Sequence, residues 1–227
     1  MADVLEASVA QKPKDKYEQW VDNYSKIRAF TNFLFDRFYK VNVEGELPKE
    51  GPRVLVLPHQ NSLDAVSLIR GIDEYLAFTY KINEQAKLIG MWAMPYIGGV
   101  KVSNSYIHFK KLFEHLDRDS LVVAFPQGVF ENDKVSYVKS GIAKLAQIYE
   151  QSRKKEVAII PAGIEYKIPK HLPKTSPLPI FKIPFPGTTA ILRFASPKSL
   201  DGRDPKELTD IVMQEAAMLS KLDYAVN

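Results

Sequence analysis

The 227-residue chain contains no cysteine, and this absence excludes disulfide bonds, thiolate metal sites and a cysteine nucleophile. Such a composition suits a reducing compartment. The chain also lacks any apolar stretch close to the ~20 residues that a membrane-spanning helix requires. Residues 1–6 have neither the basic start nor the apolar core of a signal peptide. We therefore expect a cytoplasmic protein whose contact with a membrane is peripheral or monotopic.

Several well-known catalytic motifs are missing as well. The sequence has no Gly-x-Ser-x-Gly elbow, no His-Glu-x-x-His motif, no phosphate-binding Gly-rich loop and no Gly-x-Gly-x-x-Gly fingerprint. Serine hydrolases, zinc proteases and nucleotide-binding enzymes are therefore disfavoured. His108 and His115 lie seven residues apart on one face of an expected helix, but no third ligand clusters with them. We interpret both as surface residues and expect no metal site.

Acidic residues are absent between Tyr166 and Leu200, whereas prolines and apolar residues are frequent there. The basic residues of this segment are Lys167, Lys170, Lys174, Lys182, Arg193 and Lys198. Because the prolines exclude regular helix, we expect a basic, partly apolar loop. Such a loop suits an anionic lipid surface, and the alternative is a loop that packs on its own domain. No basic recognition helix or aromatic platform indicates nucleic acid binding.

The spacing of apolar residues predicts an amphipathic helix over residues 17–39 with an unusually aromatic face. The apolar residues are Trp20, Tyr24, Ile27, Phe30, Phe33, Leu34, Phe35 and Phe38, interspersed with Lys26, Arg28, Arg37 and Lys40. The rings can pack on the core of the protein or lie in a membrane interface, and some rings can do the first while others do the second.

Strand-like and helical runs alternate along the rest of the chain, which is typical of an α/β domain with a mostly parallel central sheet flanked by helices. The expected strands are residues 40–43, 53–57, 77–80, 99–102, 121–125, 157–160 and 189–194. The further expected helices are residues 63–76, 106–116, 137–151 and 205–221. We therefore predict an N-terminal helical segment over residues 1–40 and a single domain over residues 41–227.

His59 and Asp64 are the most informative residues of the chain. Residues 53–57 indicate a buried strand and residues 63–76 a helix that starts at Asn61 or Ser62. His59 then falls in the turn, and Asp64 in the first helical turn can orient its imidazole and leave one nitrogen free as a base. The structural alternative is that the helix dipole favours a carboxylate there and that a turn histidine is simply solvated.

Together these features resemble the glycerolipid acyltransferase family, typified by bacterial 1-acylglycerol-3-phosphate acyltransferase, from about residue 40 to the C-terminus. The family's Asn-His-x4-Asp motif is matched by His59 and Asp64, with Pro58 at the usual Asn. Its Phe-Pro-Glu-Gly-Thr-Arg motif is matched in part by Phe125-Pro126-Gln127-Gly128. A Phe-Lys-x-Gly-Ala run is similar to residues 138–143, a Val-x-Pro block is similar to residues 157–161, and the lysine after the second strand is matched by Lys81.

The resemblance implies the following chemistry. His59 deprotonates an acceptor hydroxyl, Asp64 orients His59, and the alkoxide attacks an acyl thioester carried by coenzyme A or by acyl-carrier protein. The thioester is a co-substrate, and no further cofactor is implied. Lys81 and the backbone around Gly128 are expected to stabilise the oxyanion. The expected setting is phospholipid biosynthesis at an anionic membrane surface, on the inner face of the membrane.

Three positions depart from the family's motifs. Asn104 and Phe130 stand where the family has arginines, and Gln127 replaces its glutamate. Neither Asn nor Phe offers the planar fork of donors with which arginine binds phosphate. Lys101, Lys134 and Lys139 are the alternative phosphate ligands.

The candidate residues for binding substrate are therefore Lys81, Lys101, Asn104, Gln127, Gly128 and Lys139. The default acceptor is a lysophospholipid such as 1-acylglycerol-3-phosphate. The missing arginines leave two alternatives: an acyltransferase with a non-phosphate lipid or sugar acceptor, and a catalytically silent lipid-binding protein.

Overall fold

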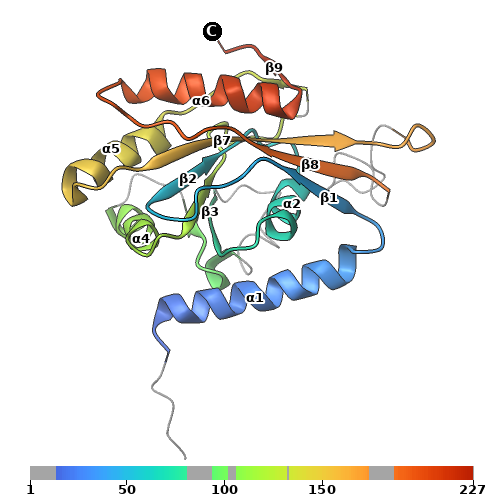
Figure 1. Cartoon of the computed structure of the whole chain (residues 1–227), viewed down its shortest axis with the longest axis horizontal. Helices are drawn as coiled ribbons and strands as arrows, with labels where there is room; N and C mark the ends of the chain where they lie inside the picture. The colour runs from blue at the N-terminus through green and yellow to red at the C-terminus, as the bar shows by residue number, and fades with distance from the viewer. Residues whose placement is uncertain (1–13, 81–93, 102–105, 132, 174–186, 227) are drawn as a thin grey trace, which may run out of the picture.

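A computed structural model describes residues 14–80, 94–101, 106–131, 133–173 and 187–226 of the chain. These residues form a seven-stranded sheet with helices on both faces (Figure 1). The strands of the sheet are β1 (Lys40–Glu44), β2 (Arg53–Val56), β3 (Leu76–Tyr80), β4 (Val100–Lys101), β5 (Leu121–Ala124), β7 (Ala158–Lys167) and β8 (Thr189–Phe194). The helices are α1 (Lys16–Phe35), α2 (Leu63–Gly71), α4 (Tyr106–Asp117), α5 (Gly141–Arg153) and α6 (Pro205–Ser220).

The sheet is mostly parallel, as predicted. Its strands follow the order β1-β8-β7-β2-β5-β3-β4, and every neighbouring pair is parallel except β7 and β8. The central strands β2, β5 and β7 therefore end at the same edge of the sheet, which is where ligands gather in open α/β folds.

Alternating side chains of β2 supply the two halves of the hydrophobic core. Val54 and Val56 point to a cluster that includes residues of α4, α5 and α6, whereas Leu55 and Leu57 point to a cluster with residues of α1 and α2. Figure 1 shows α5 and α6 on one side of the sheet and α1 and α2 on the other. The continuous aliphatic run of β2 thus reflects a strand buried on both faces.

The helix that begins at Leu63 is shorter than the sequence predicts. It ends at Gly71 because Ile72 adopts an extended backbone, with φ −111° and ψ 125°, and Leu76 already belongs to β3. The apolar residues between 72 and 76 continue the helical spacing by chance, because the core needs them in a turn and a strand. A periodicity of apolar residues cannot separate these two uses.

Strand β7 is longer than predicted, since it continues from Ile160 to Lys167. The added residues pair antiparallel with β8, from Ala162 opposite Phe194 to Lys167 opposite Thr189. The start of the expected basic loop is therefore strand. Two further short strands, β6 (Lys134–Val135) and β9 (Asp223–Tyr224), pair in parallel and were not predicted; helix α5 begins after β6, at Gly141 rather than at residue 137.

Helix α1 lies outside α2, on the side of the molecule away from α6 (Figure 1). Asp15 starts it with a capping box, because its carboxylate accepts from the backbone N–H of Glu18 and the Glu18 carboxylate accepts from that of Asp15. Trp20 and Tyr24 are buried, whereas Phe30 and Phe33 are 62% and 81% exposed. Different rings thus face the core and the solvent. A division into segments at residue 40 stays a prediction.

Candidate active site

The turn between β2 and α2 places His59 at the carboxyl edge of the sheet. β2 runs parallel to β5 and to β7, and the Leu57 N–H extends the pairing with β5 by donating to the Ala124 carbonyl, 3.2 Å away. The chain then leaves the sheet at Pro58. The turn that follows β5, with Gln127 and Gly128, emerges at the same edge.

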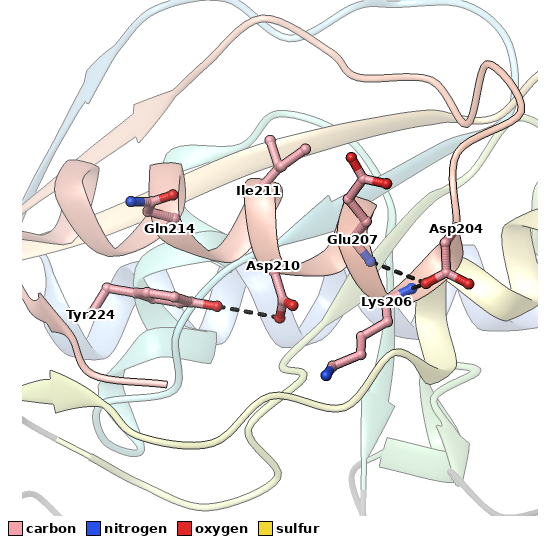
Figure 2. A pocket seen from close by; sticks show the side chains of 7 residues that line it. All are labelled: Asp204, Lys206, Glu207, Asp210, Ile211, Gln214 and Tyr224. Carbon is pink, nitrogen blue, oxygen red and sulfur yellow. Dashed lines mark hydrogen bonds between the residues drawn. The ribbon is translucent and has the colours of Figure 1, made fainter. Parts of the chain in front are cut away.

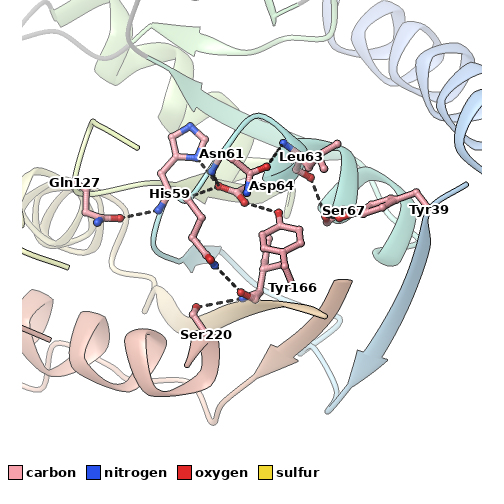
Figure 3. Close-up of polar contacts among 11 residues, drawn as sticks. Tyr39, His59, Asn61, Leu63, Asp64, Ser67, Gln127, Tyr166 and Ser220 are labelled. Carbon is pink, nitrogen blue, oxygen red and sulfur yellow. Dashed lines mark hydrogen bonds and ion pairs between the residues drawn. The ribbon is translucent and has the colours of Figure 1, made fainter. Parts of the chain in front are cut away.

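His59 and Asp64 contact each other directly (Figure 3). Nδ1 of His59 lies 2.7 Å from Oδ2 of Asp64, and Asp64 is fully buried in the first turn of α2 while the side chain of His59 is 22% exposed. Within the part of the chain that the structure describes, Nε2 of His59 makes no hydrogen bond. One imidazole nitrogen is therefore held by an acid and the other is available.

Three more donors converge on the Asp64 carboxylate. Oδ2 accepts from the backbone N–H groups of Gln60 and Asn61 at 2.7 and 3.0 Å, and Oδ1 accepts from the Tyr166 hydroxyl at 2.5 Å. Both carboxylate oxygens thus act as acceptors. We therefore assign the imidazole proton to Nδ1, which donates to Oδ2, and this leaves the lone pair on Nε2.

Tyr166, on β7, was not identified from the sequence. Burial, followed by the negative charge of Asp64, raises the pKa of its hydroxyl well above the ordinary value of 10, so the hydroxyl keeps its proton and donates. A second hydroxyl pair lies close by, where Tyr39 donates to Oγ of Ser67 at 2.6 Å and Ser67 donates to the Leu63 carbonyl (Figure 3). The acid of the pair is thus held by donors from the turn before α2 and from β7.

Two phenyl rings enclose the imidazole. Phe125 stacks on His59 with ring centroids 4.1 Å apart and an interplanar angle of 24°, and Phe130 lies 4.2 Å away at 56°. The position at which the resemblance leads us to expect an arginine is therefore an apolar wall of the site. Such a wall fixes the orientation of the imidazole and lowers the local polarity.

Gln127 and Gly128 lie in the turn after β5, next to His59. The Gln127 side chain is buried, and its Oε1 accepts from the His59 backbone N–H at 2.6 Å. Gly128 has a φ of +69°, which favours glycine. The Lys139 ammonium lies 3.8 Å from the place that a Cβ on Gly128 would occupy. Of the six predicted substrate-binding residues, Gln127 therefore contacts His59 directly, Gly128 follows it in the same turn, and the Lys139 ammonium lies beside that turn.

Of the other three predicted substrate-binding residues, the structure describes only Lys101, which is not close to His59. Lys101 is exposed at the end of β4, and β5 and β3 separate that strand from β2, which places Lys101 about 14 Å across the sheet from β2. Lys81 and Asn104 lie outside the described residues.

His115 differs from the interpretation as a surface residue. It is fully buried, with Nε2 3.0 Å from the Gly98 carbonyl and its ring 5.2 Å from that of Trp20. Burial, with smaller effects of Lys111 and Arg118, lowers its pKa from 6.5 to about 4. The side chain of His108 lies outside the described residues. Among the side chains that are described, no group of His, Asp and Glu could hold a metal ion.

The segment from Tyr166 to Leu200 is less basic than its composition suggests. Arg193 pairs with Glu44 at 2.6 Å and with Glu165 at 2.7 Å, and Lys198 pairs with Glu215 at 2.9 Å. These carboxylates come from neighbouring elements, so the local absence of acid in the sequence is compensated in the fold. Residues 174–186, with most of the prolines, lie outside the description. In the described residues, none of the helices has the length and apolar character that crossing a membrane requires.

Figure 2 shows a shallow hollow elsewhere on the molecule, along α6 and beside Tyr224. Its walls carry the carboxylates of Asp204, Glu207 and Asp210, and the Tyr224 hydroxyl lies 3.4 Å from Asp210. None of the residues around His59 lines it. The hollow is therefore separate from the candidate active site.

Comparisons with known proteins support the fold. The chain is similar to the crystal structure of the 1-acyl-sn-glycerophosphate (LPA) acyltransferase PlsC from Thermotoga maritima, with a TM-score of 0.56 and 22% sequence identity over 83% of this chain and 74% of that chain. No protein-family model matches the chain, and no curated protein matches it in sequence. At this level of identity, the chain shares the mixed α/β fold of a solved acyltransferase, with its mostly parallel sheet and flanking helices.

Proposed function

We propose that the protein is an O-acyltransferase that moves a fatty acyl group from an acyl thioester to a lipid hydroxyl. The observation that carries this proposal is the 2.7 Å contact between His59 Nδ1 and the buried Asp64 carboxylate. It leaves Nε2 as a base on the exposed side of the imidazole. The fold similarity to an acyltransferase agrees with this chemistry.

In the proposed reaction, Nε2 of His59 takes the proton of the acceptor hydroxyl, while Asp64 stabilises the resulting imidazolium. The hydroxyl oxygen attacks the thioester carbonyl carbon and forms a tetrahedral oxyanion. When the oxyanion collapses, the C–S bond breaks, and the imidazolium returns its proton to the departing thiolate. The step needs no covalent acyl-enzyme. The Lys139 ammonium and the backbone of the Gly128 turn are the described groups that can stabilise the oxyanion.

The acyl donor in this proposal is acyl-coenzyme A or acyl-carrier protein, and the default acceptor is a lysophospholipid such as 1-acylglycerol-3-phosphate. A second candidate is an acceptor without phosphate. It is favoured by Phe130, which packs 4.2 Å from the imidazole at the position where the resemblance leads us to expect a guanidinium. An apolar wall suits an uncharged lipid alcohol better than a phosphate.

We also propose that α1 docks on an anionic membrane at the cytoplasmic face. The exposed apolar residues of α1 and of the turn that follows it are called the ridge here, and they are Phe30, Phe33, Leu34 and Phe38, with exposures of 62%, 81%, 43% and 49%. The side chains of Lys26, Arg37 and Lys40 are exposed on the same stretch. Apolar rings flanked by cations are the composition of a helix that lies in a membrane interface.

An in vitro transfer assay tests the proposed function. Both donor types are paired with lysophosphatidate, other lysophospholipids and uncharged lipid alcohols, and product formation is measured for wild type, His59→Ala and His171→Ala. His171 is exposed, and no described hydrogen bond or ion pair joins it to His59 or Asp64, so its variant is the matched control. We expect His59→Ala to lose about 10²–10⁴-fold in kcat, as for removal of a general base, with unchanged folding.

Two results of this assay would contradict the proposal. Equal rates for wild type and His59→Ala would remove the catalytic assignment and leave the silent lipid-binding protein. Absence of transfer for every donor and acceptor would do the same. A strong preference for lysophosphatidate over uncharged alcohols would remove the second candidate acceptor.

A further inference from the structure

Both backbone groups of His59 are hydrogen-bonded to the turn that follows β5. The His59 N–H donates to Oε1 of Gln127 at 2.6 Å, and the His59 carbonyl accepts from the Glu131 N–H at 2.9 Å. Figure 3 shows the Gln127 amide reaching the backbone of His59 rather than its ring. The position of the imidazole therefore depends on residues 127–131, in addition to Asp64.

The Gln127 amide is itself held by Glu131. Its Nε2 donates to Oε2 of Glu131 at 2.7 Å, and the same carboxylate accepts from the backbone N–H and the hydroxyl of Ser136. Although partial burial of Glu131 opposes ionisation, the hydrogen bonds from Ser136 and Gln127 hold the pKa of its carboxyl below the usual value of 4.5. Glu131 is therefore an ionised acceptor that needs a donor at position 127.

This requirement distinguishes an amide from a carboxylate at position 127. Gln127 accepts from His59 with its oxygen and donates to Glu131 with its nitrogen, and it is only 1% exposed. A glutamate would keep the first bond and lose the second, and it would bring two carboxylates to about the 2.7 Å that now separates Gln127 Nε2 from Glu131 Oε2, one of them almost fully buried. Like charges at this distance repel strongly when they are partly buried.

We propose that Gln127 is a positioning residue of the acyl transfer, which fixes the His59 backbone through its hydrogen bond to Glu131. This inference rests on the proposed function. It makes an unusual prediction, because the glutamate that the resemblance would lead us to expect at position 127 should impair this chain. The cause is the carboxylate of Glu131, four residues further along.

The experiment compares Gln127→Glu, Glu131→Gln and the double variant at pH 8, where carboxyl groups are ionised. We expect Gln127→Glu to lose about 10²-fold in kcat with little change in KM, since displacement of a catalytic group by about 1 Å has an effect of that size. Glu131→Gln separates the charge at position 131 from its hydrogen bond. Its amide oxygen still accepts from Gln127, so its kcat should fall less than that of Gln127→Glu.

The double variant restores a donor and an acceptor with their places exchanged. A glutamate at position 127 accepts from both the His59 N–H and the new amide at position 131. The N–H of Ser136, an exposed residue, then donates to water instead of to residue 131. We expect at least about tenfold more activity than for Gln127→Glu. Equal activity of the double variant and Gln127→Glu, or wild-type activity of Gln127→Glu, would overturn the proposal.

A readout independent of turnover separates this inference from the proposed function. In NMR spectra, the His59 backbone amide, assigned with His59→Ala, should exchange faster with solvent in Gln127→Glu and slow down again in the double variant. If the exchange rates do not follow this pattern, the positioning role of Gln127 is overturned, even if the enzyme is active. If wild type shows no transfer activity, only the proposed acyltransferase function is overturned. Urea unfolding of each variant checks the fold. If Gln127→Glu does not fold, the positioning role is tested by whether the double variant folds and is active.

Discussion

At the scale of single residues, the site is a histidine whose acid is itself unusually well held. Asp64 receives four hydrogen bonds: from the His59 ring, from two backbone N–H groups and from the Tyr166 hydroxyl. A buried carboxylate is costly unless such donors surround it. The arrangement therefore satisfies the buried Asp64 carboxylate and holds it in place against the imidazole.

Replacement of Tyr166 by phenylalanine tests this arrangement. The ring stays in place, but Oδ1 of Asp64 loses its donor at 2.5 Å. We expect the free energy of unfolding to fall by about 1.5–3 kcal/mol, the usual range for a hydrogen bond to a charged group, and kcat to fall by about tenfold. Urea unfolding and steady-state kinetics measure the two effects.

Tyr96→Phe is the control for Tyr166→Phe, because Tyr96 is 52% exposed. Its stability and rate should match wild type. If Tyr166→Phe behaves like Tyr96→Phe in both measurements, the Tyr166 hydroxyl contributes nothing to the acid of the pair.

At the scale of elements, helix α1 has buried aromatic residues in one part and exposed aromatic residues in another. Trp20 and Tyr24 are 5% and 3% exposed and belong to the interior, while the ridge of Phe30, Phe33, Leu34 and Phe38 faces solvent. Exposed apolar groups gathered at the end of a helix and in the turn after it are typical of a binding surface rather than of random exposure. The buried pair anchors the helix, so the ridge keeps a fixed orientation on the surface.

The double variant Phe30→Ser/Phe33→Ser tests the docking of α1. Binding to vesicles rich in phosphatidylglycerol at low salt should weaken by at least about tenfold, because two rings no longer enter the interface. The urea midpoint should not change. Sedimentation with vesicles measures the binding, and high salt should weaken it for wild type.

Met218→Ser is the matched control for vesicle binding, since Met218 on α6 is 62% exposed and Figure 1 shows α6 on the other side of the sheet from α1. If Phe30→Ser/Phe33→Ser binds vesicles as well as wild type, or if it loses no more binding than Met218→Ser, α1 is excluded as the docking element.

At the scale of the whole molecule, His115 contacts residues from several elements that are far apart in the sequence. Its ring packs among Trp20, Tyr17 and Tyr75, and Nε2 contacts the Gly98 carbonyl. Lys111 and Arg118 are the cations that lower its pKa further, after burial. The imidazole is therefore neutral in the folded protein at neutral pH, whereas in the unfolded chain its pKa has the ordinary value of 6.5.

This difference predicts a loss of stability in mild acid. The folded pKa is about 4 and the unfolded value is 6.5, so between these values only the unfolded state binds the proton at His115. The free energy of unfolding should therefore fall as the pH drops from about 6.5 to about 4, by about 3 kcal/mol at most. Below pH 4 this contribution should fall no further.

Urea unfolding between pH 7 and pH 4.5 measures the effect in wild type, His115→Gln and His171→Gln. The glutamine at 115 can still donate to Gly98 but does not titrate, so its stability should depend less on pH than that of wild type. His171→Gln should follow wild type, because His171 is exposed. Identical slopes for all three proteins would refute the role of His115.

The sequence by itself determined the alternation of strands and helices, the mostly parallel sheet and the contact between His59 and Asp64. These features are local. A five-residue spacing across a strand-to-helix turn places the two side chains within reach of each other, and a run of aliphatic residues predicts a buried central strand. The catalytic role of the pair stays a prediction.

Only the tertiary structure decided which distant residues complete the site. Tyr166 lies 102 residues from Asp64, and Gln127 lies 68 residues from His59. Their contacts depend on which strands are neighbours in the sheet, and that order follows from packing of the whole core rather than from local periodicity. For the same reason the sequence placed His115 on the surface and Leu76 in a helix, since burial is a property of the assembled layers.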